Sequence, residues 1–198
     1  MSNNFPKIYL ARHGETEWTI TGQHTGLTDI PLTERGERNA RSLAGRLQGL
    51  TFAQVLTSPL RRARRTCELA GFGAAARADP DLVEWNYGAY EGRLTADIDK
   101  ERPGWNLFRD GCPGGETAAE VGHRVDRVIG RLRAVNGDVL VFGHSHCLRV
   151  LAARWLGLPP EAAQLFLLTT ASLSALGYEH NLHEPVIRLW NDDRHVGA

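Results

Sequence analysis

The chain has 198 residues, a length that suffices for one domain with a complete hydrophobic core. Its 23 Lys and Arg residues balance its 23 Asp and Glu residues, so the formal net charge is zero. This balance argues against a general nucleic-acid-binding protein or a membrane-surface protein, and no apolar run is long enough to span a bilayer. Because the three cysteines do not suggest a disulfide framework and no signal peptide is visible, we expect a cytoplasmic protein.

Hydrophobic periodicity predicts strands that alternate with amphipathic helices. The expected elements are, in chain order, a strand at 7–12, a loop at 14–32, a helix capped by Thr33, a strand at 52–57, a helix capped by Ser58, an irregular segment at 79–116 with a short helix at 95–101, a helix that follows a capping box at 117–120, a strand at 138–142, a helix at 147–156, and β segments at 173–178 and 185–190. We therefore expect an α/β protein, a three-layer α/β/α sandwich around a mostly parallel central sheet.

The first predicted strand ends at the pentapeptide Arg12-His13-Gly14-Glu15-Thr16. In open α/β sheets, binding and catalytic residues collect at the carboxyl ends of strands. A neutral imidazole is a nucleophile near pH 7, and an adjacent guanidinium can hold an anion, so Arg12 and His13 suggest phosphoryl transfer through a phosphohistidine. A strand that ends in a polar turn is the alternative explanation, and the pentapeptide alone does not decide between the two.

Three further polar residues follow other predicted elements. Arg62 lies in the first turn of the helix after the second strand, Glu84 ends an extended segment, and His144 follows a later apolar strand. Since the carboxyl ends of parallel strands meet at one edge of a sheet, we expect these residues to lie close to Arg12 and His13.

With these motifs in order, the sequence resembles the histidine phosphatase superfamily, in the branch that includes the cofactor-dependent phosphoglycerate mutases. The matching pieces are residues 12–16, Thr25-Gly26-Leu27-Thr28, Leu32-Thr33 with Gly36, Ser58-Pro59-Leu60, Arg62-Ala63 with Thr66, Glu84 with Gly88 and Glu91-Gly92, Gly115-Glu116, and His144 with Arg149. Many relatives have two glycines where this chain has Ser145 and His146. That difference, with the stretch 105–112, resembles the subgroup of acid phosphatases and sedoheptulose-bisphosphatase-like enzymes.

The resemblance implies a role for each residue of the constellation. His13 resembles the nucleophile, Arg12, Arg62 and His144 resemble the phosphate pocket, and Glu84 resembles the proton donor. A transferring phosphoryl group carries charge on its three equatorial oxygens, so positive charge and positioning supply most of the catalysis. An alkyl or sugar oxygen is a poor leaving group and needs a proton, so the acid should stay partly protonated through apolar neighbours such as Trp85.

Substrate contacts are expected from residues beside this constellation. The candidates for contacts to the phosphate or to a second phosphate are Thr19, Thr25, Gly26, Ser145 and Arg109. Residues 85–116 are expected to form a wall or lid over the pocket, and their aromatic side chains could either stack on a substrate or pack in the core. All of residues 1–198 are expected to form a single histidine phosphatase domain.

We therefore expect a metal-independent phosphatase, with no cofactor, that hydrolyses small phosphate monoesters such as sugar phosphates. The stretch between Glu84 and Gly115 is too short to hold the basic insert of the mutases, so mutase-type phosphoryl transfer is kept only as an alternative. A serine esterase is the less favoured alternative, because residues 143–147 nearly match a nucleophile elbow around Ser145, with Asp192 and His195 as its partners. The sequence leaves the oligomeric state open, a homodimer included.

Overall fold

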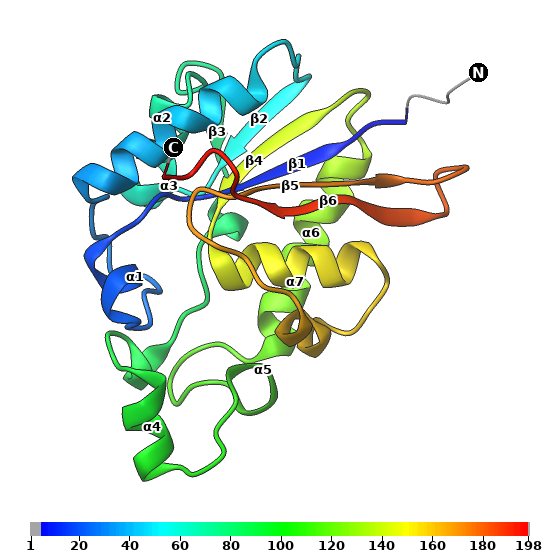
Figure 1. The fold of residues 1–198 in the computed structure, drawn as a ribbon. Helices are drawn as coiled ribbons and strands as arrows, with labels where there is room; N and C mark the ends of the chain where they lie inside the picture. The colour runs from blue at the N-terminus through cyan, green and yellow to red at the C-terminus, as the bar shows by residue number, and fades with distance from the viewer. Residues whose placement is uncertain (1–4, 198) are drawn as a thin grey trace.

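A six-stranded sheet with helices on both faces organises residues 5–197, the part of the chain that the computed structural model describes (Figure 1). The strands are β1 (Ile8–Arg12), β2 (Gln54–Thr57), β3 (Ala76–Ala78), β4 (Val139–Gly143), β5 (Leu173–Tyr178) and β6 (Pro185–Asp192). Their order is β3-β2-β4-β1-β5-β6, in which the first four strands are parallel to one another, β5 is antiparallel to β1, and β6 is antiparallel to β5. The expected α/β sandwich with a mostly parallel central sheet is confirmed.

Two helix pairs cover the two faces of the sheet. The helices are α1 (Glu17–Thr21), α2 (Glu34–Leu47), α3 (Arg61–Leu69), α4 (Thr95–Glu101), α5 (Leu107–Asp110), α6 (Ala118–Arg133) and α7 (Ser145–Trp155), with 3-10 turns at Pro80–Leu82, Gly88–Tyr90 and Pro160–Leu165. Ile8 and Leu10 pack in the core that α6 and α7 close, whereas Tyr9 and Ala11 pack in the core beneath α2 and α3. This alternation is the two-residue period of a strand that is buried on both faces.

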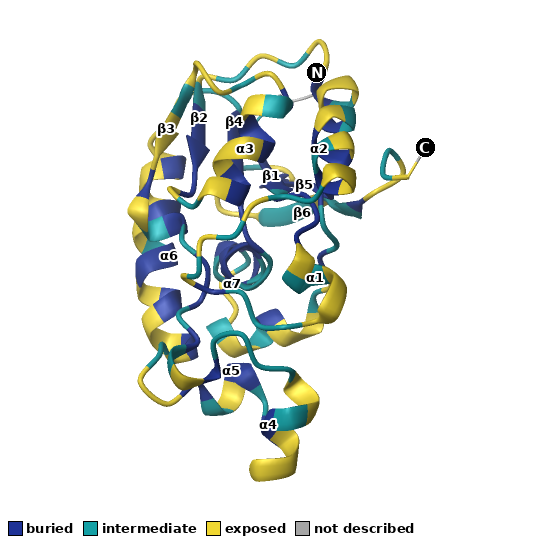
Figure 2. Ribbon diagram, turned by 90° about the vertical axis from the view of Figure 1, so that its left-hand side faces the viewer, coloured by how far each residue is buried: buried dark blue, intermediate teal, exposed yellow. Residues whose placement is uncertain are grey.

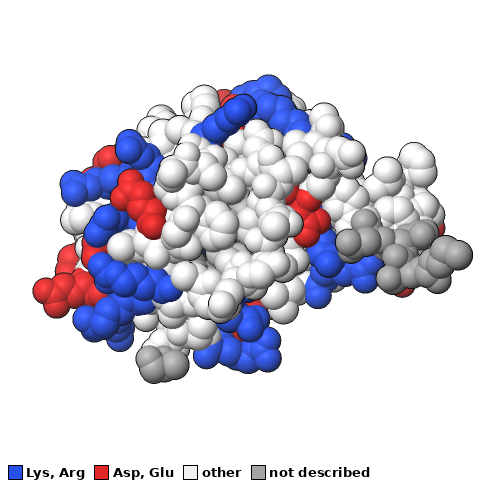
Figure 3. All heavy atoms as spheres, turned by 90° about the horizontal axis from the view of Figure 1, so that it is seen from above, with Lys and Arg blue, Asp and Glu red and all other residues white. Residues whose placement is uncertain are grey.

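Burial is high in the central strands and low in a helix at the periphery. Strands β2 and β4 are largely buried, whereas α4 projects from the body with mostly exposed residues (Figure 2). The face in Figure 3 carries acidic and basic side chains around a largely uncharged centre. Within residues 5–197, no helix combines the length and the apolarity needed to cross a membrane.

Several predicted helix boundaries are confirmed, and one predicted cap is wrong. Thr33 caps α2, and a capping box at Thr117 opens α6. Ser58 does not cap α3, because that helix begins at Arg61 and Leu60 is its N-cap. The helices and strands that were not predicted from the sequence are α1, inside the expected loop at 14–32, α5, inside the expected irregular segment at 79–116, and the three-residue edge strand β3.

Close contact between two glycines fixes the turn after β1. A Cβ atom on Gly14 would lie 2.5 Å from the carbonyl oxygen of Gly36, and a Cβ atom on Gly36 would collide with the backbone of Glu15. The Glu15 carboxylate accepts a hydrogen bond from Thr33 at 2.7 Å and pairs with Arg35. The end of β1 is therefore held tightly against the start of α2.

The aromatic residues of segment 85–116 mostly pack in the core. Those with at most 8% of their surface exposed are Trp85, Tyr87, Tyr90, Trp105 and Phe108. The indole N–H groups of Trp85 and Trp105 donate to the carbonyl oxygens of Glu116 and Gly111, at 2.8 and 2.9 Å. These aromatic residues share one hydrophobic core with Ile8, Leu10 and the buried residues of α6 and α7, and this packing fixes the segment beside the carboxyl edge of the sheet.

Candidate active site

Side chains from separated segments meet where β1 and β4 end. His13 directly follows β1 and His144 directly follows β4, and the His13 backbone N–H donates to the Gly143 carbonyl at 3.0 Å. The two imidazole centroids are 5.2 Å apart. Arg62, the second residue of α3, donates from Nε to Nδ1 of His144 at 3.1 Å. The predicted convergence of these three residues is therefore present.

The His13 ring has one protonated and one unprotonated nitrogen. Nδ1 lies 2.7 Å from the Gly14 carbonyl oxygen, which can only accept, so Nδ1 carries the proton and Nε2 holds a lone pair. Burial of the ring, followed by the charges of Arg62 and Arg12, lowers the pKa of His13 well below its ordinary value. The imidazole is therefore neutral at pH 7, with Nε2 available for bonding.

His144 has the opposite tautomer. Because Arg62 donates to Nδ1, the proton lies on Nε2, which donates to the Ser58 hydroxyl at 2.7 Å. The residue is fully buried, and burial together with the charge of Arg62 lowers the pKa of His144 well below its ordinary value. Ser58 thus orients an N–H donor next to His13 instead of capping a helix.

Backbone carbonyl groups hold the Arg62 guanidinium in place. It donates to the carbonyl oxygens of Thr25, Gly26 and Thr28 at 3.2, 2.8 and 3.0 Å. The loop is fixed in turn by Glu91, whose Oε1 accepts from the Gly26 and Thr28 amides at 2.8 and 3.1 Å. The Gly26 amide is therefore already paired, contrary to its predicted use as a donor to phosphate.

Arg12 is held by one end of its guanidinium. One terminal nitrogen donates to the Leu168 carbonyl, while Nε is buried and has no hydrogen-bond partner among residues 5–197. Burial lowers the pKa of Arg12 to about 10, so the group stays charged at pH 7. A buried N–H without a partner costs on the order of 1–3 kcal/mol, which an anion in contact with it would remove.

Glu84 sits at the N-terminus of α7. Its carboxylate accepts backbone N–H bonds from Trp85, His146 and Cys147 at 2.9, 3.0 and 2.9 Å, and 3% of the residue is exposed. These three donors compensate for the burial of the carboxylate. Trp85 was expected to act on Glu84 as an apolar neighbour, but its contact with the carboxylate is a polar one through the backbone.

A cavity of about 280 Å³ opens next to these groups. Its lining residues are Arg12, His13, Trp18, Thr19, Gly22, Gln23, His24, Thr25, Glu84, Tyr87, Thr95, Ser145 and His146. Of the predicted substrate contacts, Thr19, Thr25 and Ser145 lie in this lining. Thr19 also closes the capping box of α1, where its hydroxyl oxygen accepts from the Thr16 amide at 2.9 Å.

Arg109 is not brought to the cavity. Its guanidinium is exposed and forms an ion pair with the neighbouring Asp110 at 2.7 Å, and it also donates to the Gly104 carbonyl. The short α5 begins at Leu107, and that helix directs Arg109 to solvent while Leu107 and Phe108 are buried.

No role was predicted from the sequence for His24, which lines the cavity. His24 packs against Tyr87 with ring centroids 4.7 Å apart, and the Tyr87 hydroxyl lies 2.6 Å from Nδ1 of His146. Burial raises the pKa of Tyr87 well above its ordinary value, so the phenol is the donor in this bond. The only signal for His24 in the sequence was its position just before Thr25-Gly26, a matching piece of the family motif.

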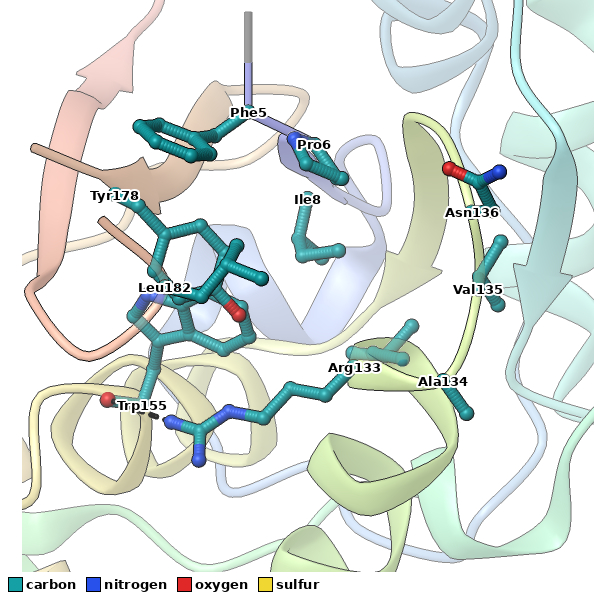
Figure 4. A pocket seen from close by; sticks show the side chains of 11 residues that line it. Phe5, Pro6, Ile8, Arg133, Ala134, Val135, Asn136, Trp155, Tyr178 and Leu182 are labelled. Carbon is teal, nitrogen blue, oxygen red and sulfur yellow. Dashed lines mark hydrogen bonds between the residues drawn. The ribbon is translucent and has the colours of Figure 1, made fainter. Parts of the chain in front are cut away.

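Two other features of the structure offer ligand-like geometry away from this site. Glu179, His180 and Glu184 are exposed and place ligand atoms within 4.8 Å of one another, where His180 and Glu184 already form an ion pair. A cavity of about 320 Å³ lies near the amino end of β1, between Phe5, Trp155, Tyr178 and Leu182 among others (Figure 4). Neither contains a residue of the predicted constellation.

Comparison with known families decides the classification. The family model described as histidine phosphatase superfamily (branch 1) matches residues 8–193. The chain belongs to this superfamily. The predicted resemblance is confirmed, and with it the predicted enzyme class of phosphoric monoester hydrolase.

The relatives of this histidine phosphatase are named for several different activities. The chain is 41% identical to sedoheptulose 1,7-bisphosphatase of Saccharomyces cerevisiae, over 77% of the chain and 68% of the relative, and 38% identical to an acid phosphatase of Mycobacterium tuberculosis, over 90% and 89%. It is also 34% identical to a Photorhabdus laumondii protein named "Probable phosphoglycerate mutase GpmB", over 88% and 86%.

Solved structures share the fold over nearly the whole chain. A functionally characterised open reading frame of Mycobacterium tuberculosis superimposes with a TM-score of 0.88 at 35% identity, covering 94% of this chain and 97% of that one. The alpha-ribazole phosphatase of Shigella flexneri superimposes with a TM-score of 0.81 at 30% identity, covering 94% and 96%. The sheet and its helices are thus those of a histidine phosphatase.

Proposed function

We propose that this histidine phosphatase hydrolyses small phosphate monoesters through a phosphohistidine formed on Nε2 of His13. The observation that carries the proposal is a buried, neutral imidazole with an unprotonated Nε2, placed beside the buried guanidinium of Arg62 and the partly buried side chain of Arg12. Relatives named for a sugar bisphosphate and for general acid phosphatase activity support sugar phosphates and similar metabolites as the substrate class.

The proposed first step transfers the phosphoryl group to the protein. Nε2 of His13 attacks phosphorus, the bond from phosphorus to the leaving oxygen breaks, and protonated Glu84 donates its proton to that oxygen. Arg12, Arg62 and His144 stabilise the charge that develops on the equatorial oxygens, and for this the Nε2–H of His144 exchanges its bond to Ser58 for one to a phosphoryl oxygen. The Nδ1–H of His13, bonded to the Gly14 carbonyl, orients the ring and supports the positive charge that it gains.

The proposed second step regenerates the protein. The Glu84 carboxylate takes a proton from a water molecule, whose oxygen attacks phosphorus while the bond to Nε2 breaks. Inorganic phosphate leaves, and Glu84 is again protonated for the next cycle. Thr19, Thr25 and Ser145 are proposed contacts to the substrate at the mouth of the cavity, and residues 85–116 are proposed as its wall, with Tyr87 and His146 nearby.

The cellular location and the oligomeric state of the protein are also proposals. A cytoplasmic location agrees with three buried cysteines that form no disulfide within residues 5–197. A homodimer remains a prediction, for which sedimentation equilibrium is the direct measurement.

Mutase-type transfer is a second candidate function, favoured by the relatives named as phosphoglycerate mutases. The esterase alternative has less support. Within the described chain, no histidine nitrogen lies within hydrogen-bond distance of the Ser145 hydroxyl. Asp192, its proposed acid, pairs instead with Arg46 and Arg194.

A panel of phosphorylated metabolites tests these candidates together. We expect phosphate release from several of them, abolished in His13→Ala and retained in Ser145→Ala, with slow or no interconversion of the two phosphoglycerates. Rapid interconversion would favour the mutase, and ester hydrolysis that depends on Ser145 but not on His13 would favour the esterase.

A further inference from the structure

A loop that precedes β5 holds the backbone and side chain of the Arg12–His13 pair. The Leu168 carbonyl accepts from the Arg12 guanidinium, and the Ser172 carbonyl accepts from the Arg12 amide at 3.2 Å. The Ala171 amide donates to the His13 carbonyl at 3.0 Å. Residues 168–172 therefore set the position of both the backbone and the side chain of Arg12.

This loop is held in a conformation that its sequence does not favour. Ala171 has a φ of +56°, in the left-handed region, although it carries a Cβ atom. Such a residue costs on the order of 1 kcal/mol or more and persists only where its surroundings determine it. Some other part of the structure must supply those constraints.

The constraints come from the end of β6 and the residues after it. Oδ1 of Asn191 accepts from the Thr169 amide at 2.7 Å and from the Thr169 hydroxyl at 3.0 Å. Asp193 lies 3.0 Å from the same hydroxyl and shares its one hydrogen with Asn191, and Nε2 of His195 lies 2.8 Å from the Ala171 carbonyl. Asn191 is itself left-handed, with a φ of +53°.

We infer that Asn191 is a positioning residue, which fixes loop 168–172 and through it the place of Arg12 in the phosphate pocket. The path runs from Asn191 Oδ1 to Thr169, along the loop to Leu168, Ala171 and Ser172, and from their backbone groups to Arg12 and His13. The link to phosphate rests on the proposed function of Arg12, whereas the link to the Arg12 backbone does not.

Hydrogen exchange measured by NMR tests the structural link. Asn191→Gly removes the acceptor oxygen but tolerates the positive φ, so the Arg12 and Ala171 amides should exchange about 10-fold faster. Asn191→Asp keeps an acceptor oxygen and should restore slow exchange. The matched control is Asn181→Gly, since Asn181 Oδ1 also accepts a backbone N–H, that of His183 at 2.8 Å, in the exposed turn after β5.

Calorimetric titration with inorganic phosphate tests the functional link. Asn191→Gly should weaken phosphate binding about 10-fold, while Asn191→Asp and Asn181→Gly should bind like the wild type. Unchanged exchange at Arg12 and Ala171 in Asn191→Gly would overturn the inference, whether or not phosphate binds. Faster exchange with unchanged phosphate affinity would also overturn it, because the contact would then be structural only. A wild type that binds no phosphate would contradict the proposed function, and the exchange rates would still decide the link to Arg12.

Discussion

The two cavities near opposite edges of the sheet differ in what is buried around them. The cavity near the amino end of β1 is the larger of the two, at about 320 against 280 Å³, and its lining consists mainly of apolar side chains such as Ile8 and Leu182 (Figure 4). The cavity at the carboxyl edge is bordered by His13 and Glu84, both buried ionisable groups. Volume therefore does not distinguish the site, but buried ionisable groups do.

The cost of burial explains why this difference is informative. Taking an ionisable group out of water costs several kcal/mol unless partners compensate for it, so a fold retains such groups where they are used. At the amino edge, the charged residue in the lining is Arg133, which is exposed and lies 5.0 Å from the Trp155 ring centroid. At the carboxyl edge, Arg62 is fully buried and donates to four groups.

Exchanging one arginine for lysine at each edge gives the largest expected contrast. Arg62→Lys keeps the charge but loses the planar fork that reaches His144 and the carbonyl groups of the 25–28 loop, and kcat/KM should fall by about 10²–10³. Arg133→Lys should leave kcat/KM within about twofold of the wild type. Steady-state kinetics of the two variants, with folding checked by circular dichroism, measure the difference. Equal losses of kcat/KM in the two variants would contradict the assignment of the reaction to the carboxyl edge.

The identity of the leaving group should separate the role of Glu84 from that of the arginines. Glu84→Gln cannot supply a proton, so hydrolysis of alkyl phosphates should slow by about 10²-fold or more. Hydrolysis of nitrophenyl phosphate, whose leaving group needs little protonation, should slow by about 10-fold or less. A comparison of kcat for the two substrates checks this, and equal losses would contradict a proton-donor role.

The pH dependence should reflect the neutral histidines of the carboxyl edge. Because the pKa of His13 is lowered well below 6.5, its neutral form should persist, and kcat/KM should not fall with a midpoint near 6.5 through its protonation. The unfolded chain binds these protons near pH 6.5 but the folded chain does not, so stability is present above that pH and is lost as the pH falls. The slope is up to about 1.4 kcal/mol per pH unit for each such histidine.

Rate profiles and denaturant unfolding from pH 8 to pH 5 measure both effects. Since the pKa of His144 is lowered in the same direction, the two residues should act together on stability. A loss of rate centred on the ordinary histidine pKa and traced to His13, or a stability that rises as the pH falls, would contradict the buried neutral state.

The smallest effect is expected from the apolar rim of the amino-edge cavity. Leu182 is 56% exposed, so Leu182→Ala should change the unfolding free energy by about 0.5 kcal/mol or less and leave kcat/KM within about twofold. Urea titration and steady-state kinetics check the two numbers. A tenfold loss of activity would show that this cavity acts on the reaction.

Much of the secondary structure could be predicted, because helix caps and helical periodicity depend on residues that are close in the sequence. The Thr33 cap, the Thr117 capping box and the short helix at 95–101 depend on neighbouring residues and were confirmed. Ser58 was assigned to a cap because Ser followed by Pro is typical of a helix start, but its hydroxyl pairs with His144, 86 positions away. Strand β3 depends on pairing with β2, which a three-residue segment does not signal by itself.

The site was predictable where its side chains follow strands or start helices. Arg12, His13, Arg62 and His144 were expected together for that reason and do lie together. The partners that fix them are mostly backbone groups, such as the carbonyl of Leu168, and backbone groups leave no residue-type signal. Arg109, a predicted substrate contact, does not reach the cavity, because the four-residue helix α5 directs its side chain to solvent.

The central claim is that one buried imidazole becomes covalently phosphorylated, and trapping the intermediate tests it most directly. Rapid quenching during turnover of a phosphate monoester, under alkaline conditions, should give a phosphorylated peptide that contains His13. That phosphate should be stable to base and labile to acid, and it should be absent from His13→Ala. Phosphate on another residue, or turnover by His13→Ala at the wild-type rate, would contradict the account.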